Sequence, residues 1–208
     1  MKIISYSLFG DNPYYLDGAV LNVEMAKNVF PGWICRFYVD HNVPTYYINK
    51  LKELGAEIII MQRKTKSQFE AISWRFAAAT DSDVMIVRDT DSALLERDKI
   101  AVDEWLASDK DFHIIRDYTF SSSRIMGGIW GCRNGILKDV NIYLEKWLNK
   151  SPVHWFGPDD MLFLNMVIWP LVKDNAYIHD QYGLQFTDET TYKIDYTYDS
   201  NNYIGAKI

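Results

Sequence analysis

Two aspartates one residue apart are the residues of this sequence with the most evident chemistry. The stretch 84–92 reads VMIVRDTDS, so a short apolar strand runs directly into Asp89 and Asp91. Side chains alternate along a strand, and we therefore expect both carboxylates on the same side of the chain. Neighbouring carboxylates repel each other unless a cation lies between them. Mg²⁺ and Mn²⁺ take oxygen ligands and carry substrate phosphates, so the pair predicts a metal–diphosphate site; the alternative is an acidic turn that caps the next helix.

The bulk composition predicts one globular domain and limits its partners. The 208 residues are 48% hydrophobic and carry a formal net charge of −6, without a basic run. A nucleic-acid partner is therefore not expected, because phosphates need a positive surface. No apolar stretch is long enough to cross a bilayer, and residues 1–10 lack the features of a signal peptide. Cys35 and Cys132 lie in apolar runs, which favours free thiols but leaves a disulfide between them open.

Strand and helix patterns alternate along the first half of the chain. We expect strands at residues 2–9, 33–39, 56–61 and 84–88, and helices at 17–30, 46–54 and 68–79. Such alternation predicts βαβ units, a mostly parallel sheet and a ligand site at the carboxyl ends of the strands. Asp89 and Asp91 follow such an end.

The second half is less regular. We expect helices at residues 99–106, 137–148 and 157–168, and strands at 112–116, 127–132 and 176–178. Either Asp159 or Asp160 suits the N-cap of the helix at 157–168. His179 and Asp180 follow the last expected strand directly.

With this order of elements and an Asp-x-Asp motif, the chain resembles GT-A glycosyltransferases, which use nucleotide-sugar donors. Leu8, Asn12 and Tyr15 resemble the uridine-binding loop of the glycogenin-like (family 8-like) branch. The resemblance implies an α/β fold: a single GT-A (Rossmann-like) domain over residues 1–208, with a mostly parallel central sheet and flanking helices. The chain is either this whole domain or one module of a longer protein. The implied nucleotide-sugar ligands are Leu8, Gly10, Asn12, Tyr15, Arg75, Asp89, Thr90, Gly127 and Gly128.

The resemblance also assigns roles at the reacting centre. Arg75 is expected to reach the donor, because a guanidinium matches phosphate oxygens. Gly127 and Gly128 would lie beneath the donor sugar, where glycine permits close approach. Asp160 matches the sugar-contacting Asp of an Asp-Gln-x-x-Leu-Asn pattern, with Met161 in place of the Gln. Asp160 is therefore the first candidate for catalysis, and Asp159 and Asp117 are the reserves.

A divalent metal is implied as well. The resemblance assigns Asp89, Asp91 and His179 as ligands of Mn²⁺ or Mg²⁺, with Asp180 orienting the histidine. The basic residue that holds the diphosphate in the family has no clear counterpart, and Lys193 is the candidate.

A narrower pattern resembles small glycosyltransferase domains of large DNA viruses, chlorella viruses among them, and of bacterial polysaccharide loci. It comprises WRF at 74–76, RDTDS at 88–92, Arg97, AVDEW at 101–105 and HIIRD at 113–117. We interpret Arg88, Arg97 and Trp105 as structural supports. The resemblance implies transfer of a hexose or deoxyhexose from a UDP-sugar to a glycan or glycoprotein, as in a surface or capsid glycan. The expected location is cytoplasmic, and the host cytoplasm if the chain is viral.

Other classes fit less well. A dinucleotide-binding enzyme would need G-x-G-x-x-G after the first strand, where this chain has a single glycine, Gly10. An aspartate-based phosphotransferase carries its Asp-x-Asp after the first strand rather than the fourth. A nucleotidyltransferase acting on sugar phosphates and a non-catalytic nucleotide-sugar-binding module remain as alternatives.

Overall fold

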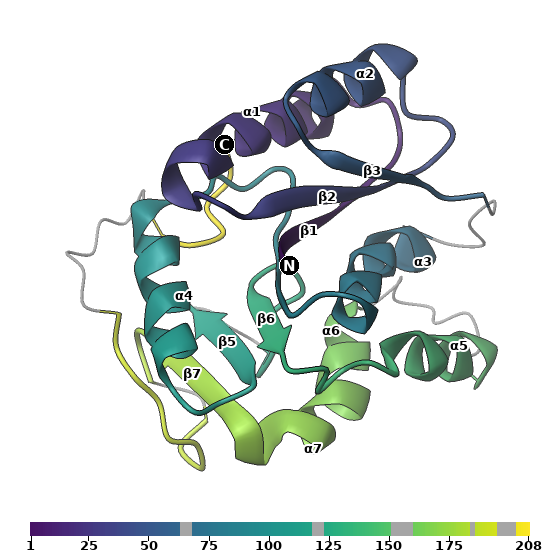
Figure 1. Cartoon of the computed structure of the whole chain (residues 1–208). Coiled ribbons are helices and arrows are strands. Elements are labelled where there is room, and N and C mark those ends of the chain that lie inside the picture. Colours follow the sequence, from purple (N-terminus) through teal and green to yellow (C-terminus); the bar gives the residue numbers. More distant parts are fainter. Residues whose placement is uncertain (63–67, 118–122, 151–159, 184–185, 195–202) are drawn as a thin grey trace.

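The computed structural model describes residues 1–62, 68–117, 123–150, 160–183, 186–194 and 203–208. Within these residues seven strands form one sheet: β1 (Lys2–Leu8), β2 (Ile34–Val39), β3 (Glu57–Ile60), β4 (Val84–Val87), β5 (Phe112–Arg116), β6 (Trp130–Arg133) and β7 (Ala176–Asp180). Their order across the sheet is β3-β2-β1-β4-β6-β5-β7 (Figure 1). Strand β6 runs antiparallel to β4 and β5, and the other neighbouring pairs are parallel. The predicted mostly parallel α/β sheet is confirmed.

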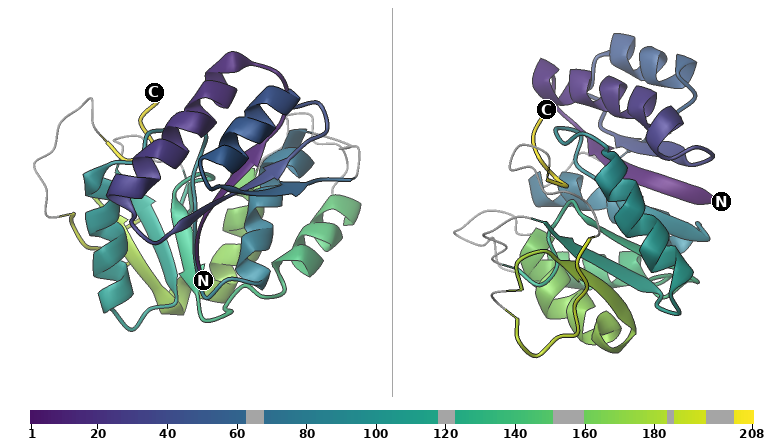
Figure 2. Two further views of the ribbon diagram at one scale, coloured as in Figure 1. Left: turned by 45° about the horizontal axis from the view of Figure 1, so that its top comes forward. Right: turned by 90° about the vertical axis from the view of Figure 1, so that its left-hand side faces the viewer.

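Helices cover both faces of this sheet. They are α1 (Pro13–Val29), α2 (Thr45–Glu53), α3 (Gln68–Ser73), α4 (Glu96–Ala107), α5 (Val140–Lys150), α6 (Asp160–Phe163) and α7 (Trp169–Val172). Three irregular helical segments accompany them: η1 (Trp74–Thr80), the π-helical η2 (Leu164–Ile168) and η3 (Lys173–Asn175). Figure 2 shows α1 and α2 side by side over the β1–β3 part of the sheet. None of the helices in the described residues is long and apolar enough to span a membrane.

The hydrophobic core is divided by the sheet. Alternation along β1 sends Ile4 and Tyr6 to the face covered by α1 and α2, whereas Ile3 packs on the opposite face. Cys35 and Cys132 are buried free thiols, one on each side. Burial raises the pKa of the Cys35 thiol to about 12, so this thiol stays protonated at neutral pH.

Helix α1 begins four residues earlier than the sequence pattern predicts. Asn12 caps it: its Oδ1 accepts a hydrogen bond from the backbone N–H of Tyr14 at 3.1 Å. Pro13 occupies the first helical position, where its fixed φ suits the helix and no N–H is needed. As a result Tyr15 lies in the first helical turn and not in a loop.

The expected helix at residues 68–79 divides into α3 and the 3₁₀ segment η1. Two serines of β1 bond to its backbone: Ser5 Oγ donates to the carbonyl of Arg75 at 2.6 Å, and Ser7 Oγ donates to that of Ile72 at 2.9 Å. The Arg75 N–H in turn donates to Ser7 Oγ at 3.1 Å. These bonds tie Arg75 to the central strand and tighten the helix locally.

Two strands in the second half have different bounds from those expected. Gly127 and Gly128 form a turn before β6, which starts only at Trp130. Strand β7 continues to Asp180, so His179 lies inside the sheet and not in a loop after it.

Candidate active site

A pocket of about 660 Å³ opens at the carboxyl ends of β1 and β4. Its size is typical of a small-molecule site. The structure brings together here most of the residues that the sequence singled out: Leu8, Gly10, Asn12, Tyr15, Arg75, Asp89, Thr90, Asp91, Gly127, Gly128 and Asp160. Five stretches far apart in the sequence supply them, and the order of the strands in the sheet brings these stretches together.

One side of the pocket is made by the end of β1 and the start of α1. Gly10 adopts a φ of +78°, and its N–H donates to Asn42 Oδ1 at 3.0 Å, which turns the chain into the helix. Asn12 uses its side-chain oxygen for the helix cap, so its Nδ2 group is the part open to a ligand. Tyr15 keeps 40% of its surface exposed and lines the pocket.

Arg75 joins two of the acidic residues of the site, Asp89 and Asp160. Its Nη1 donates to Asp89 Oδ1 and to the backbone carbonyl of Arg88. Its Nη2 donates to Asp160 Oδ2 at 3.3 Å and to the carbonyl of Gly127 at 3.1 Å. The guanidinium is almost fully buried, and its Nε has no partner among the described residues. One cation therefore sets the relative position of the first motif aspartate and the candidate catalytic aspartate.

The charges in this cluster shift each other's ionisation. Burial raises the pKa of the Asp160 carboxyl; Arg75 opposes this increase and Asp89 adds to it, so that the pKa lies above its usual value. Burial by itself would lower the pKa of the Arg75 guanidinium, but Asp89 and Asp160 raise it above its usual value. Arg75 therefore stays charged, and the raised pKa of Asp160 makes its carboxyl easier to protonate than an exposed aspartate.

The two glycines of the turn before β6 allow the carboxylates to approach the backbone. A Cβ at Gly128 would lie 1.8 Å from Asp89 Oδ2, and one at Gly127 would lie 2.3 Å from Asp160 Oδ2. A Cβ at either position would therefore require the facing carboxylate to move. Glycine permits the close packing of these carboxylates against the chain.

Asp91 faces the pocket next to a lysine that the sequence analysis did not identify. Lys207 Nζ lies 3.5 Å from Asp91 Oδ2, and 71% of the lysine side chain is exposed. The segment Tyr203–Ile208 also supplies three lining residues, Tyr203, Ile204 and Gly205. Sequence pattern offered no signal for this segment, because its contacts depend on a chain reversal over more than a hundred residues.

The position of His179 corrects its interpretation as a metal ligand. Its side chain is fully buried; Nδ1 lies 2.9 Å from His113 Nε2, and Nε2 lies 2.7 Å from Glu104 Oε2. Since β7 extends past this residue, the ring contacts side chains of β5 and α4 and does not line the pocket that holds Asp89 and Asp91.

Asp117 also differs from the expectation. It is fully buried and receives Arg97 Nε at 2.6 Å and Nη2 at 2.7 Å. It does not line the pocket, and a catalytic role in contact with substrate is corrected to a structural one. Arg88 pairs in the same buried manner with Asp98, at 2.8 and 2.5 Å, which agrees with the supporting role expected of it.

Two further candidates stay without a site role. Asp159 lies outside the described residues. Lys193 donates to the backbone carbonyls of Asp180 and Gln181 and does not line the pocket.

Comparison with known proteins shows the fold. No family model and no curated protein matches the sequence. Among solved structures, a glycosyltransferase involved in glycosylation of the major capsid of PBCV-1 is 15% identical; the alignment covers 88% of this chain and 83% of that one, with a TM-score of 0.53. The glycosyltransferase GlyE of Streptococcus pneumoniae TIGR4 is 16% identical over 88% of this chain and 47% of its own, with a TM-score of 0.54. The galactosyltransferase LgtC, in complex with donor and acceptor sugar analogs, is 10% identical; the alignment covers 86% of this chain and 73% of that one, with a TM-score of 0.53.

These neighbours are GT-A glycosyltransferases, and the predicted GT-A fold is confirmed. At identities of 10–16% the likeness concerns the arrangement of the backbone. Chemistry has to be argued from the pocket itself.

Proposed function

We propose that this chain is a metal-dependent glycosyltransferase that moves a hexose or deoxyhexose from a UDP-sugar to a glycan or glycoprotein acceptor. One observation carries the proposal. The pocket at the carboxyl ends of β1 and β4 places Asp89 and Asp91 within the same cavity as Asp160, with Arg75 joining Asp89 to Asp160. This is the ligand-binding edge of an open α/β sheet.

The electrostatic balance of the pocket supports a bound cation. Among the described lining residues, Asp11, Asp89, Asp91 and Asp160 are acidic, whereas Arg75 is basic and already engaged by two of them. A diphosphate would meet net repulsion in such a cavity. A divalent ion that binds both the carboxylates and the phosphate oxygens removes this repulsion.

The residues present fit Mg²⁺ or Mn²⁺ bound together with the donor. With His179 directed elsewhere, the described residues offer two motif carboxylates and no cluster of three His, Cys, Asp or Glu side chains. Two carboxylates, water and substrate phosphates form a common ligand set for these hard cations. When bound, the ion would act as a Lewis acid on the leaving diphosphate.

The chain's own residues would divide the remaining work. Tyr15 offers a ring for stacking on the base, and Asn12 an amide donor beside it. The glycine turn leaves space at the backbone for the sugar. Asp160, held by Arg75 and by the N–H of Met161 at 2.9 Å, lies where a carboxylate can hydrogen-bond a sugar hydroxyl or take the acceptor proton.

Two structural neighbours support the ligand classes. LgtC was solved with donor and acceptor sugar analogs, and the mannosyltransferase PcManGT of Pyrobaculum calidifontis with GDP-Man and Mn²⁺. The latter is 10% identical over 87% of this chain and 55% of its own, with a TM-score of 0.51. The capsid glycosyltransferase neighbour likewise suggests a surface or capsid glycan as acceptor.

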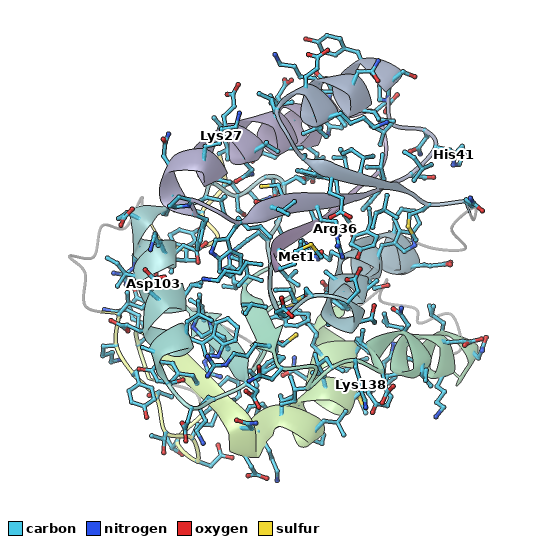
Figure 3. All side chains as sticks on the ribbon, viewed as in Figure 1. Met1, Lys27, Arg36, His41, Asp103 and Lys138 are labelled. Atoms are coloured by element: carbon cyan, nitrogen blue, oxygen red, sulfur yellow. The ribbon has the colours of Figure 1, made fainter. Side chains whose placement is uncertain are left out.

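Calorimetric titration with UDP, GDP and dTDP, each with and without Mn²⁺, tests the proposal. UDP should bind with Mn²⁺ and lose at least about tenfold in affinity without it. Asp91→Asn should abolish the Mn²⁺-dependent part, whereas Asp103→Asn, on the outer surface of α4 (Figure 3), should not. Equal UDP affinity with and without metal, or tighter binding of GDP, would contradict the proposed site.

Catalysis needs a second measurement. Release of UDP from a UDP-sugar on addition of glycan acceptor, with the sugar recovered on that acceptor, separates a transferase from a non-catalytic binding module. Formation of a nucleotide sugar from a nucleoside triphosphate and a sugar phosphate would indicate the nucleotidyltransferase alternative.

A further inference from the structure

The segment Tyr203–Ile208, here called the strap, forms one wall of the pocket although it is far in sequence from the other walls. Figure 1 shows this yellow end of the ribbon between α1 and α4, and both views of Figure 2 agree. Tyr203, Ile204 and Gly205 line the cavity. Its position must be maintained by contacts with the rest of the protein, because the strap is not part of the sheet.

One set of contacts joins the strap to the Asp-x-Asp loop. Ser92 and Lys207 form an isolated antiparallel bridge, and Ser92 Oγ donates to the carbonyl of Gly205 at 3.1 Å. The N–H of Ile208 donates to the carbonyl of Asp91 at 2.9 Å. The backbone of Asp91 is thus bonded directly to the strap.

A second set anchors the strap from below. The N–H of Ile204 donates at 3.0 Å to Asp117 Oδ2, the oxygen that also receives Arg97 Nε. A hydrogen bond to a buried carboxylate is stronger than one between neutral groups. The Ile204 side chain is 2% exposed and packs in a small cluster with Ile115, Ile129 and Ile194.

The Arg97–Asp117 pair is therefore better placed than a surface contact to hold the strap. Both side chains are buried, and their two short bonds leave little freedom to the carboxylate. Ile204 is the residue at which this fixed carboxylate meets the strap. From there the chain continues through Gly205 and Lys207 to the backbone of Asp91 and Ser92.

We propose, on the basis of the function proposed above, that Asp117 and Ile204 are positioning residues. They hold the strap, and the strap in turn fixes the backbone of Asp91 so that its carboxylate is oriented toward the metal and diphosphate. Asp117 does not line the pocket, and Ile204 takes part through its backbone N–H. Their loss should weaken metal binding in the presence of nucleotide. Loss of the residues that hold a metal ligand in place generally lowers metal affinity.

Ile204→Pro separates this role from general stability. Proline removes the N–H that bonds Asp117 and keeps an apolar side chain, while the Arg97–Asp117 pair remains. Ile194→Pro is the matched control, because Ile194 belongs to the same cluster and its N–H donates to a side-chain oxygen, that of Gln181 at 3.4 Å. Asp117→Asn and its control Asp180→Asn form a second pair, since Asp180 is bound by Arg116 at the ends of the same strands.

Two readouts are measured on the full chain: the Mn²⁺ concentration for half-maximal binding at fixed UDP, and amide hydrogen exchange in the segments 89–92 and 203–208. We expect Ile204→Pro and Asp117→Asn to raise the Mn²⁺ requirement about 10- to 100-fold and to speed exchange in both segments. The two control variants should leave the Mn²⁺ requirement close to that of the unmodified chain.

Faster exchange with an unchanged Mn²⁺ requirement would overturn the proposal, as would unchanged exchange in the segment 89–92. If the unmodified chain shows no Mn²⁺-dependent UDP binding, the proposed function fails and the positioning of Asp91 toward a metal fails with it. If exchange in the segment 203–208 stays slow in Ile204→Pro, the bond from Ile204 to Asp117 does not anchor the strap. That result would contradict the positioning proposal and leave the proposed function intact.

Discussion

At the scale of single residues, Arg75 is the centre of the site. The sequence suggested a guanidinium that reaches the donor phosphates. In the structure its Nη groups are bonded to Asp89, Asp160 and two backbone carbonyls, which leaves little capacity for a phosphate. Its evident work is to hold two carboxylates that would otherwise repel each other at close range.

Asp160 is the carboxylate whose removal should separate binding from chemistry. Asp160→Asn keeps the shape and the bond from the Met161 N–H but loses the charge. We expect nearly unchanged Mn²⁺-dependent UDP binding and a loss of sugar transfer of at least about 100-fold, the usual scale for a positioned acid or base. Binding is measured by calorimetry and transfer by UDP release. Near-normal turnover in this variant would remove Asp160 from the reacting centre.

Gly128 provides a test of the packing beneath Asp89. A Cβ there would lie 1.8 Å from Asp89 Oδ2, so Gly128→Ala should cost about 1–3 kcal/mol in the free energy of unfolding. In an Asp89→Ala background the same change should cost much less, because the obstructing carboxylate is gone. Chemical denaturation of the unmodified chain, the two single variants and the double variant measures these free energies as a double-mutant cycle. An equal cost in both backgrounds would show that the carboxylate does not restrict the turn.

At the scale of elements, the ends of α1 and η1 decide where side chains point. Asn12 and Pro13 start α1 early, which raises Tyr15 onto the first turn beside the pocket. The hydroxyls of Ser5 and Ser7 draw η1 against β1 and thereby aim Arg75 at the carboxyl edge of the sheet. Local caps and side-chain bonds thus convert a regular βα pattern into a binding edge.

Tyr15 is the residue through which α1 would contact the base. Tyr15→Ala should weaken UDP binding by about 1–3 kcal/mol, since stacking on an aromatic ring is lost. Tyr46, 70% exposed on α2 and not part of the pocket, supplies the control variant Tyr46→Ala. Titration with UDP in the presence of Mn²⁺ measures both. Equal affinities for the two variants would exclude stacking by Tyr15.

At the scale of the whole molecule, buried polar groups connect the second half of the sheet. Glu104, His179 and His113 form a chain of hydrogen bonds from α4 across β7 to β5. Burial lowers the pKa of His113 well below its usual value, with His179 and Arg88 adding to the effect. Burial also lowers the pKa of His179, although Glu104 opposes this.

These shifts predict acid sensitivity. The unfolded chain takes up protons near pH 6.5, whereas the folded chain keeps both histidines neutral, so stability is present above that pH and is lost as the pH falls below it. The loss should approach about 1.4 kcal/mol per pH unit for each histidine. His113→Gln should reduce this slope, because it removes a buried imidazole with a lowered pKa. Denaturation between pH 5 and 7.5, a range of about one unit or more either side of the ordinary histidine pKa, measures the slopes; identical slopes would contradict the assignment.

The sequence alone was sufficient for the sheet class, for the Asp-x-Asp motif at the end of β4, and for many of the residues that line the pocket. The sheet class and the place of the motif follow from local periodicity and from the rule that parallel strands end at one edge. The other lining residues were expected from the resemblance to GT-A glycosyltransferases. It also indicated that Arg88, Arg97 and Trp105 support the fold.

Only the tertiary structure decided the roles that depend on long-range pairing. Strand β7 is two residues longer than expected, so His179 lies in the interior of the sheet and not in the site. There its pairing with the neighbouring strand β5 places it beside His113. The buried Arg97 made Asp117 an anchor, and the strap brought Lys207 to Asp91 from the other end of the sequence. Such contacts leave no periodic trace in the chain, since they arise only when the finished sheet places distant segments side by side.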